Sequence, residues 1–364
     1  MDPRIGPSLA KVVPVAVPKK IRHQGLLFIP LKNIVLVDND PEDCILQAKK
    51  WEKVEEHGNE QGGGHTPVLV QRVIDALGCH SLGVYVDCTV GQAGLASAIL
   101  TASAPDGRLI GIDRDREAIA ASRRRLHEYG HRVRLIHGHF VDVATYLSGA
   151  GFDHADGIVF DLGVSSAQLD DSLRGFSFMV DGPLDMRMDQ TSGLTAADLL
   201  QRLSEVELAD IIFRYGEERY ARRIARAIVR ARSHDPVRTT GDLASVVKAA
   251  VPVAYRHGRI HCATRTFQAV RIAVNRELDE LERAFERAAE ALAPGGRLCI
   301  ISFHSLEDRV AKQTVRRLAQ GSGASLKILT KKPVIASDEE RRMNPRARSA
   351  KLRIAERLPQ GRSV

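Results

Sequence analysis

The sequence predicts an α/β protein, built on a doubly wound parallel sheet with an all-helical segment inserted into it. Between residues 65 and 170, short apolar runs alternate with amphipathic stretches. This order is typical of parallel strands joined by helices. The alternation stops after residue 170 and resumes at residue 263. Several apolar runs end in an aspartate, which places carboxylates at the sheet edge where such folds bind their ligands.

Four buried strands are predicted before the insertion, and amphipathic stretches lie between them. Apolar residues recur at helical spacing over 67–77, from Gly94 to Ala104, and over 115–129, so helices are expected there. The strands are expected over 83–87, 108–113 and 133–137, and in the apolar run that ends at Asp161.

The segment 171–262 contains no convincing strand and is predicted to form four helices. Ser204 and Thr240 are placed to cap two of them. The third helix carries a one-signed excess of arginine, which favours a surface facing phosphates, although a solvated face is the ordinary alternative. The helices are expected over 195–203, 205–213, 217–232 and 240–250, and the arginines are Arg219, Arg222, Arg223, Arg226, Arg230 and Arg232.

After the insertion, residues 264–292 are predicted to form one long helix that ends before Pro294 and two glycines. A core strand over 297–302 leads into another helix. Ser305 and Asp308 have the spacing of a capping box at the start of that helix. Residues 352–356 are expected to form a closing strand.

Charge, cysteine content and the length of the apolar runs indicate which partners and sites to expect. The formal net charge of +8 and the pI of about 9.3 suit a polyanionic partner. The five cysteines are scattered without a CxxC pair, so we expect neither a disulfide framework nor a metal site. There is no apolar run long enough to cross a membrane and no secretory signal pattern at the start. A cytoplasmic protein without a membrane partner is expected.

Residues 1–63 differ from the rest of the chain. Four prolines punctuate the first twenty residues, and three glycines end at Gly64. The composition is typical of a partly disordered N-terminal extension, and a misassigned start codon is the alternative. The predicted organisation is therefore an extension over 1–63, a sheet domain over 64–170 and 263–364, and a helical domain over 171–262.

The turn after the first strand indicates a cofactor that contains adenosine. Gly91 and Gly94 follow that strand and open a helix, whose first N–H groups are free to meet a ligand. Asp113 ends the next strand, 19 residues after Gly94, where a carboxylate is placed to bind ribose hydroxyls. Nicotinamide-dependent oxidoreductases and S-adenosylmethionine-dependent enzymes share this pattern, so the turn alone leaves both open.

Longer motifs carry a resemblance to one family. Together they resemble the small-subunit ribosomal RNA cytosine-N4 methyltransferases of the RsmH/MraW type, over about residues 65–358. The motifs are Asp161–Asp171, Arg174–Phe178, Asp181–Asp189, Tyr215–Tyr220, Ala263–Leu278, Ile301–Arg309 and Asn344–Arg353.

This resemblance implies a class I, Rossmann-like methyltransferase sheet, with S-adenosylmethionine as methyl donor. It implies a cytidine of the small ribosomal subunit RNA near the decoding site as acceptor, and it makes the helical insertion an RNA-recognition domain. Cofactor contacts carried over by motif position fall at Gly91, Ala93, Gly94, Leu95, Asp113, Phe140, Asp161 and Gln168.

The first motif departs from the family pattern. Ala93 stands where the family has glycine, Leu95 where it has histidine, and Ala96 where it has serine. The extra Cβ of Ala93 costs little unless this residue needs a positive φ. These departures motivate a second hypothesis, a non-catalytic RNA-binding assembly factor of the ribosome.

The expected chemistry is methyl transfer to a weakly nucleophilic amine, which the enzyme must hold in line with the donor. Asp161 is the first candidate for contact with the amine, and His304 is the second candidate for a proton acceptor. Ser165 and Ser166 are candidates for orienting the base. The oligomeric state stays open, a homodimer included.

Phosphate contacts are expected from arginines in the family motifs, because RNA binding draws on cationic side chains. Internal salt bridges with Asp185 or Glu277 are the alternative for some of them. The candidates are Arg174, Arg187, Arg265, Arg271, Arg346 and Arg348.

Overall fold

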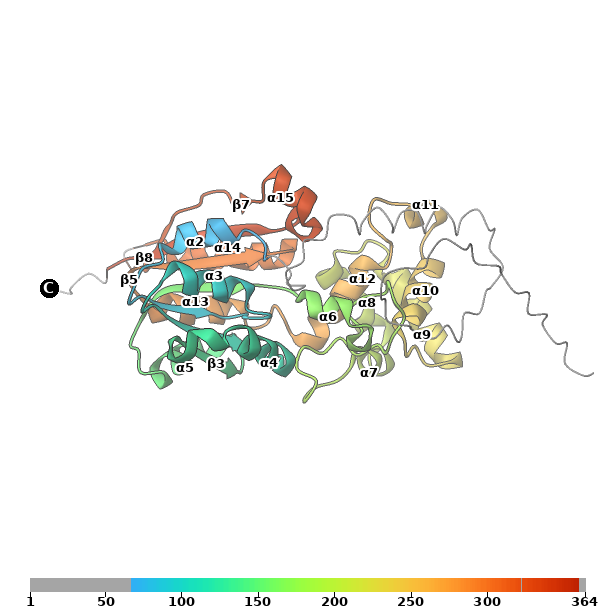
Figure 1. The fold of residues 1–364 in the computed structure, drawn as a ribbon. Helices are drawn as coiled ribbons and strands as arrows, with labels where there is room; N and C mark the ends of the chain where they lie inside the picture. Colours follow the sequence, from blue (N-terminus) through green and yellow to red (C-terminus); the bar gives the residue numbers. More distant parts are fainter. Residues whose placement is uncertain (1–66, 322, 360–364) are drawn as a thin grey trace, which may run out of the picture. The chain divides into compact units, whose positions relative to one another are not determined.

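The computed structural model describes residues 67–321 and 323–359. The predicted N-terminal extension lies outside these residues. The described part folds into a mixed, mostly parallel sheet with helices on both faces and a separate group of helices, as Figure 1 shows. This confirms the predicted α/β fold class with a helical insertion.

The sheet order among the described residues is β3-β2-β1-β4-β5-β8-β6, and β7 pairs with β8. Strands β1 to β5 pair in parallel, while β8 runs antiparallel to β5, β6 and β7. The order reverses between β1 and β4, and the ligand crevice of an open α/β sheet lies at such a point. The strands are β1 Val84–Asp87, β2 Arg108–Asp113, β3 Val133–His137, β4 Ala155–Asp161, β5 Leu292–Ser302, β6 Leu326–Ile328, β7 Val334–Ile335 and β8 Lys351–Arg357.

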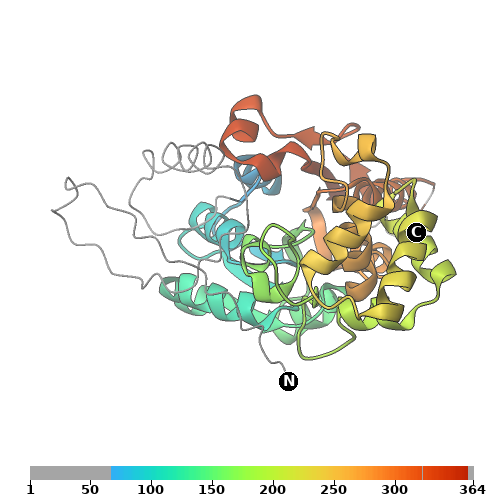
Figure 2. The ribbon, with the colours of Figure 1, turned by 90° about the vertical axis from the view of Figure 1, so that its right-hand side faces the viewer.

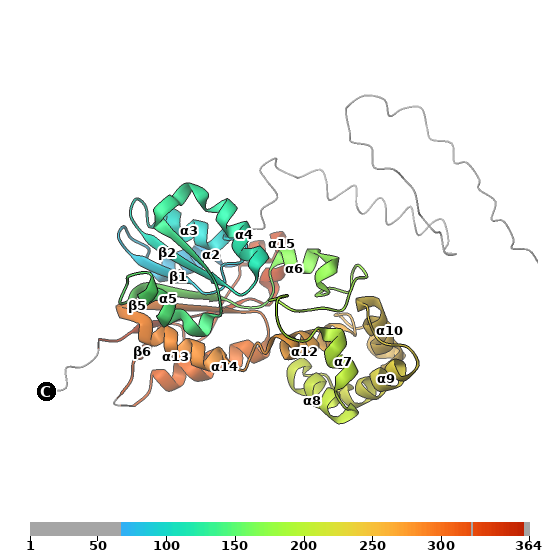
Figure 3. The ribbon, with the colours of Figure 1, turned by 90° about the horizontal axis from the view of Figure 1, so that it is seen from below.

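Helices pack against both faces of the sheet through two hydrophobic cores. Figure 3 shows these helices on either side of the sheet, seen from below. One face is covered by α5 (Val143–Gly149), α13 (Leu281–Ala291) and α14 (Ser305–Leu318). The other face is covered by α2 (Val70–Leu77), α3 (Gly94–Ala102) and α4 (Arg116–Arg125). Because both faces are buried, β1 and β4 are continuous apolar runs rather than alternating ones.

A third core joins the helices of the insertion. It includes Phe176 near its start and Phe267 and Val270 of α12, so the helical core continues past residue 262. These helices lie beside the sheet in Figure 1, and Figure 2 views the molecule from their side, with the helices in green-yellow to orange in front. They are α6 Ser166–Asp170, α7 Ala196–Arg202, α8 Glu205–Gly216, α9 Ala221–His234, α10 Thr240–Ala250, α11 Val253–Arg256 and α12 Thr264–Asn275.

Shorter elements complete the described chain, and no helix in these residues is long and apolar enough to cross a membrane. The remaining helices are α15 Asp338–Met343 and the 3-10 segments η1 His127–Arg132, η2 Phe140–Asp142, η3 Ser172–Arg174 and η4 Pro345–Arg348.

The predicted helix over 264–292 is wrong in one respect, because the structure has two helices there. Helix α12 ends at Asn275, and Arg276 adopts a left-handed conformation with φ of 50°. Helix α13 then begins at Leu281. The break brings Glu277 to the ligand crevice, where it pairs with Arg271.

Two predicted caps are also wrong by one residue. Thr239 caps α10, with Asp242 completing the box, and the Thr240 side chain instead contacts residues 180–182. His304 caps α14, with Glu307 completing the box. The preference for Ser and Thr at helix caps does not tell which of two neighbouring residues is the cap. For α14, the end of β5 at Ser302 determines where the helix begins. The cap predicted at Ser204 is confirmed.

Candidate functional site

A cavity of about 360 Å³ opens at the carboxyl ends of the parallel strands. Asp87 ends β1, Asp113 ends β2 and Asp161 ends β4, and all three line the cavity. The loop after β5 and the segment around η4 complete the wall. The predicted site residues that line the cavity are Gly91, Gly94, Leu95, Asp113, Phe140, Asp161, Ser165, Ser166, Gln168, Arg271, His304 and Arg346.

The turn between β1 and α3 is held open by backbone conformation. Gly91 has φ of 52° and Ala93 has φ of 60°, so both residues adopt the left-handed region. Ala93 therefore occupies the conformation in which its Cβ is strained. Its side chain offers α3 no cap, which leaves the first N–H groups of the helix directed at a ligand. Leu95, in place of the family's histidine, is 4% exposed and packs in the core.

Asp113 fixes the other side of this turn. Its carboxylate accepts hydrogen bonds from the N–H of Gly91 at 2.9 Å and from the N–H of Asp115 at 2.9 Å. The residue predicted to hold a ribose therefore also supports the glycine turn. Burial raises the pKa of Asp113 above its usual value, although the two N–H donors oppose that shift.

Asp161 has the most unusual environment of the described carboxylates in the cavity. Its N–H donates to the Thr89 hydroxyl at 2.7 Å, while its buried Oδ1 has no hydrogen-bond partner. Burial, and then the charges of Asp87 and Glu307, raise the pKa of Asp161 to about 8. Burial also raises the pKa of Asp87 to about 7. A carboxyl group with an unpaired oxygen and a pKa near neutrality suits proton transfer.

The loop after β4 is shaped by a capping box. Ser165 accepts from the N–H of Gln168 at 3.2 Å, and the Gln168 side chain accepts from the N–H of Ser165 at 3.0 Å. The Gln168 amide also donates to Asp115 at 2.8 Å. Arg346, from η4, donates to the Ser166 hydroxyl and lies 3.9 Å from Asp170. Both serines therefore face the cavity with their hydroxyls already oriented by neighbours.

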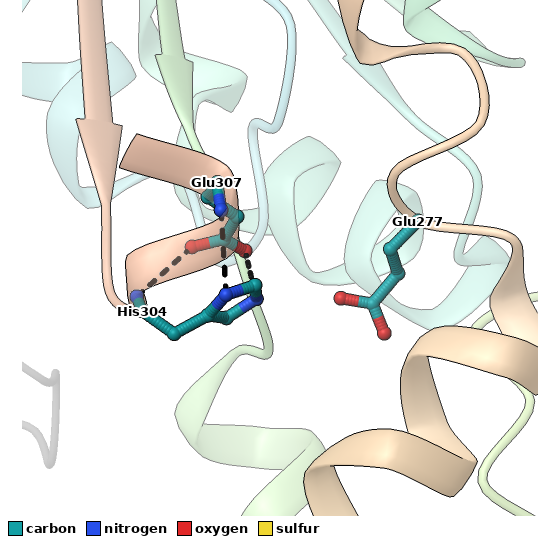
Figure 4. Close-up of side chains that lie close together, drawn as sticks. All are labelled: Glu277, His304 and Glu307. Atoms are coloured by element: carbon teal, nitrogen blue, oxygen red, sulfur yellow. Dashed lines mark hydrogen bonds and ion pairs between the residues drawn. The ribbon is translucent and has the colours of Figure 1, made fainter. Parts of the chain in front are cut away.

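Four charged or polar groups meet at the start of α14. Figure 4 shows the His304 imidazole between the carboxylates of Glu307 and Glu277. His304 Nε2 lies 3.1 Å from Glu307 Oε1, and Nδ1 accepts the Glu307 N–H at 3.4 Å. Because both ring nitrogens face Glu307, the geometry favours Asp161 over His304 as the proton acceptor. Burial alone would raise the pKa of Glu307, but the contacts with His304 and Arg271 hold it below its usual value.

The same group has the spacing of a metal site, since ligating atoms of Glu277, His304 and Glu307 lie within 4.8 Å of one another. Arg271, however, forks onto both oxygens of Glu277 at 2.9 Å and 2.9 Å. The guanidinium already supplies the positive charge that this carboxylate needs. We therefore interpret the group as a chain of buried ion pairs.

Three predicted phosphate contacts have internal partners instead. Arg174 is 3% exposed and pairs with Asp115 at 2.9 Å, so its guanidinium has internal partners and little surface to offer RNA. Arg187 pairs with Asp185 at 2.8 Å and Arg271 with Glu277, which are the two salt bridges that the sequence offered as the alternative. A sequence motif identifies which arginines to consider but does not show which of them are buried. Only an accessible arginine can contact RNA.

The remaining candidates are more accessible. Arg348 is exposed, and Arg265 is half-buried and donates to the Glu217 carbonyl at 3.1 Å. Sequence reasoning missed Arg114, which lines the cavity and donates to the Asn275 carbonyl at 3.0 Å. Its position directly after the strand-ending Asp113 was the available signal. Ala93 does not line the cavity, because its side chain points into the core.

Comparison with known proteins gives the same family as the motifs. The sequence profile of the MraW methylase family matches residues 63–358. Ribosomal RNA small subunit methyltransferase H of Geobacter sp. (strain M21) is 52% identical over 307 residues, covering 81% of this chain and 98% of that protein. The protein of that name from Symbiobacterium thermophilum is 49% identical over 310 residues, covering 82% and 98%.

A solved rRNA methylase from Streptococcus thermophilus is similar at a TM-score of 0.39 and 11% identity, covering 81% of this chain and 100% of that chain. That likeness is too distant to add to the argument, which depends on the family profile and the curated relatives. Since the match spans nearly all of the described residues, the chain belongs to the MraW methylase family.

Proposed function

We propose that this protein transfers a methyl group from S-adenosylmethionine to the N4 amine of a cytidine in small-subunit ribosomal RNA, near the decoding site. The observation that carries the proposal is the Asp161 carboxyl, which lines the cavity beside the glycine turn and whose pKa is raised to about 8 by burial and by the charges of Asp87 and Glu307. Membership of the MraW family and relatives named ribosomal RNA small subunit methyltransferase H support it. Such a protein works in the cytoplasm, where ribosomal RNA is.

The residues at the glycine turn fit the methyl donor. Gly94 lies so close to the Pro67 ring that a Cβ there would overlap it, which keeps the backbone near the cavity. The uncapped start of α3 offers N–H groups to a carboxylate, and Asp113 and Phe140 line the side that the family assigns to the adenosine. When bound, S-adenosylmethionine supplies a methyl group activated by its positively charged sulfur.

The chain's own part in the reaction is to hold the amine and take its proton. The lone pair of the cytosine amine is delocalised into the ring, so the amine must be held in place by a hydrogen-bond acceptor. The Asp161 carboxylate at the cavity wall is such an acceptor when ionised. As the N–C bond forms and the C–S bond breaks, the nitrogen becomes acidic and its proton moves to Asp161. The thioether that remains carries no charge.

The target base must leave its stack to reach this cavity. We propose that the insertion holds the surrounding RNA. Arg222, Arg223 and Arg230 of α9 are exposed and lie on one helix. Arg219 lies over the rings of Tyr220 and Tyr255, each at 4.8 Å. A helix face with several unburied arginines supplies the sequence-independent attraction that binding to a phosphate backbone requires.

The second candidate, a non-catalytic assembly factor, is motivated by Ala93 and Leu95. Backbone N–H contacts do not depend on either side chain, so we expect donor binding to survive both changes. The test is isothermal titration of the full chain with S-adenosylmethionine, followed by transfer of labelled methyl to small ribosomal subunits that lack the modification. Donor binding with transfer supports the enzyme, and RNA binding without donor binding supports the assembly factor. Asp161→Asn is the matched control, expected to abolish transfer.

A further inference from the structure

A buried polar network connects the glycine turn, the loop after β4 and the start of the helical insertion. Its central members are Arg174, Asp115 and Gln168, which are 3%, 4% and 6% exposed. None of the three belongs to a hydrophobic core, and Arg174 does not line the cavity. Burying a charged pair and an amide together is costly unless each group has partners. The partners therefore show what the network holds in place.

Arg174 joins the insertion to the sheet domain. Its guanidinium lies 2.9 Å from Asp115 and 2.9 Å from Glu117 on the sheet side. It also donates to the carbonyl oxygens of Arg187 and Met188 at 3.0 Å each. The two terminal nitrogens of one planar group thus contact four acceptors from two separate chain segments, while the buried Nε has no partner. A lysine ammonium has no such fork and cannot reach all four.

Asp115 connects Arg174 to residues that line the cavity. One oxygen receives Arg174 and the Gln168 amide, and the other caps α4 through the N–H of Glu117 at 2.9 Å. Gln168 in turn holds Ser165 in the capping box. The N–H of Asp115 donates to Asp113, the residue that supports the glycine turn.

We propose that Arg174 is a positioning residue for methyl transfer: it seats the start of the insertion on Asp115 and so fixes Gln168 and the Ser165–Ser166 turn at the cavity wall. The inference depends on the proposed function, because it assigns that wall to the donor and the acceptor base. It follows that the donor site is complete only when the loop from Arg174 to Met188 is docked on the sheet domain. Arg174 then acts on donor binding without touching RNA.

The loop itself is built to hold this position. Gly175 has φ of 70°, and a Cβ there would overlap the Pro183 carbonyl oxygen. On its other side, the N–H of Met188 donates to the Asn275 side chain at 2.8 Å, and Asn275 also donates to the Met186 carbonyl at 2.7 Å. One end of the loop is therefore fixed by a tight turn at Gly175, and the other end by part-buried hydrogen bonds to Asn275.

The experiment measures binding of S-adenosylhomocysteine to the full chain by calorimetry, for wild type, Arg174→Lys and Arg174→Met. We expect the dissociation constant to rise about tenfold or more in both variants, because small displacements of a site cost that much. The control is Arg353→Met, which breaks another buried pair, Arg353 with Asp308 at 2.7 Å, away from the cavity. It should lower the melting temperature without changing the dissociation constant.

A second readout separates positioning from RNA contact. If Arg174 bound a phosphate, its substitution would raise KM for the RNA and lower the salt dependence, with donor affinity unchanged. That outcome overturns the proposal, as does wild-type donor affinity in Arg174→Met. An equal loss of donor affinity in Arg353→Met would also overturn it, because the effect would then be general destabilisation. Absence of donor binding to the wild-type chain would overturn the proposed function itself.

Discussion

Asp161→Asn should make the protein more stable while it removes methyl transfer. The Asp161 carboxyl loses solvent on folding and gains no hydrogen bond to Oδ1, and its pKa rises from 3.8 to about 8. Between these two values the folded state retains a proton that the unfolded state has released. Folding stability therefore falls as pH rises through this window, and the contribution is constant above about pH 8. Asparagine has nearly the same shape and does not ionise.

The size of the effect follows from that window. At pH 7 the carboxyl lies about three pH units above its unfolded pKa, and each unit corresponds to about 1.4 kcal/mol. The ceiling is on the order of 4 kcal/mol, and we expect roughly half of it, because part of the shift comes from the charge of Asp87, whose own pKa burial raises to about 7. For a domain of this size that gain corresponds to a melting temperature roughly 5 °C higher. Near pH 4 the gain should vanish.

The assay is thermal melting of donor-free wild type and Asp161→Asn from pH 4 to pH 9. The control is Asp308→Asn, where Arg353 and Lys351 outweigh burial and lower the pKa. That carboxylate stabilises the fold fully above its unfolded pKa, so its substitution should destabilise the protein by a nearly constant amount from about pH 5 to pH 9. A gain for Asp161→Asn that does not change with pH, or a loss at pH 8, would refute the reasoning.

Three further predictions concern the same cavity and the insertion loop. Arg271→Met should cost about 3–5 kcal/mol by leaving buried Glu277 unpaired, and the double variant with Glu277→Gln should recover most of it in urea unfolding. Gly175→Ala should cost more than about 2 kcal/mol, from positive φ and the overlap with Pro183, and should weaken donor binding in calorimetry. The acid limb of the wild-type kcat/KM should lie near pH 8 in transfer assays, because Asp161 must be ionised to accept the proton; a limb below pH 5 would assign the proton to another group.

Much of the sheet was predictable, because its pattern is local. The apolar runs of β2 and β3 have the bounds that the sequence indicates, 108–113 and 133–137. The interior of β2 is apolar because the strand is buried on both faces, and the strand ends where the chain becomes polar. The aspartates that end β1, β2 and β4, together with the glycine turn, were enough to locate the ligand crevice.

The misses involve contacts between distant segments. Nothing in residues 264–292 shows that α12 stops at Asn275, because the stop depends on Met186 and Met188 taking up the Asn275 side chain. The burial of Arg174 likewise depends on Asp115, which caps α4 and is distant from Arg174 in the sequence. The Cβ of Ala93 was expected to matter only if the residue needed a positive φ. The structure shows that it does, with φ of 60°.

The most direct test of the account is nucleoside analysis after transfer from labelled S-adenosylmethionine to small ribosomal subunits that lack the modification. The account predicts label in N4-methylcytidine for the wild type and none for Asp161→Asn. Label in a different nucleoside, or an Asp161→Asn variant that transfers at the wild-type rate, would contradict it.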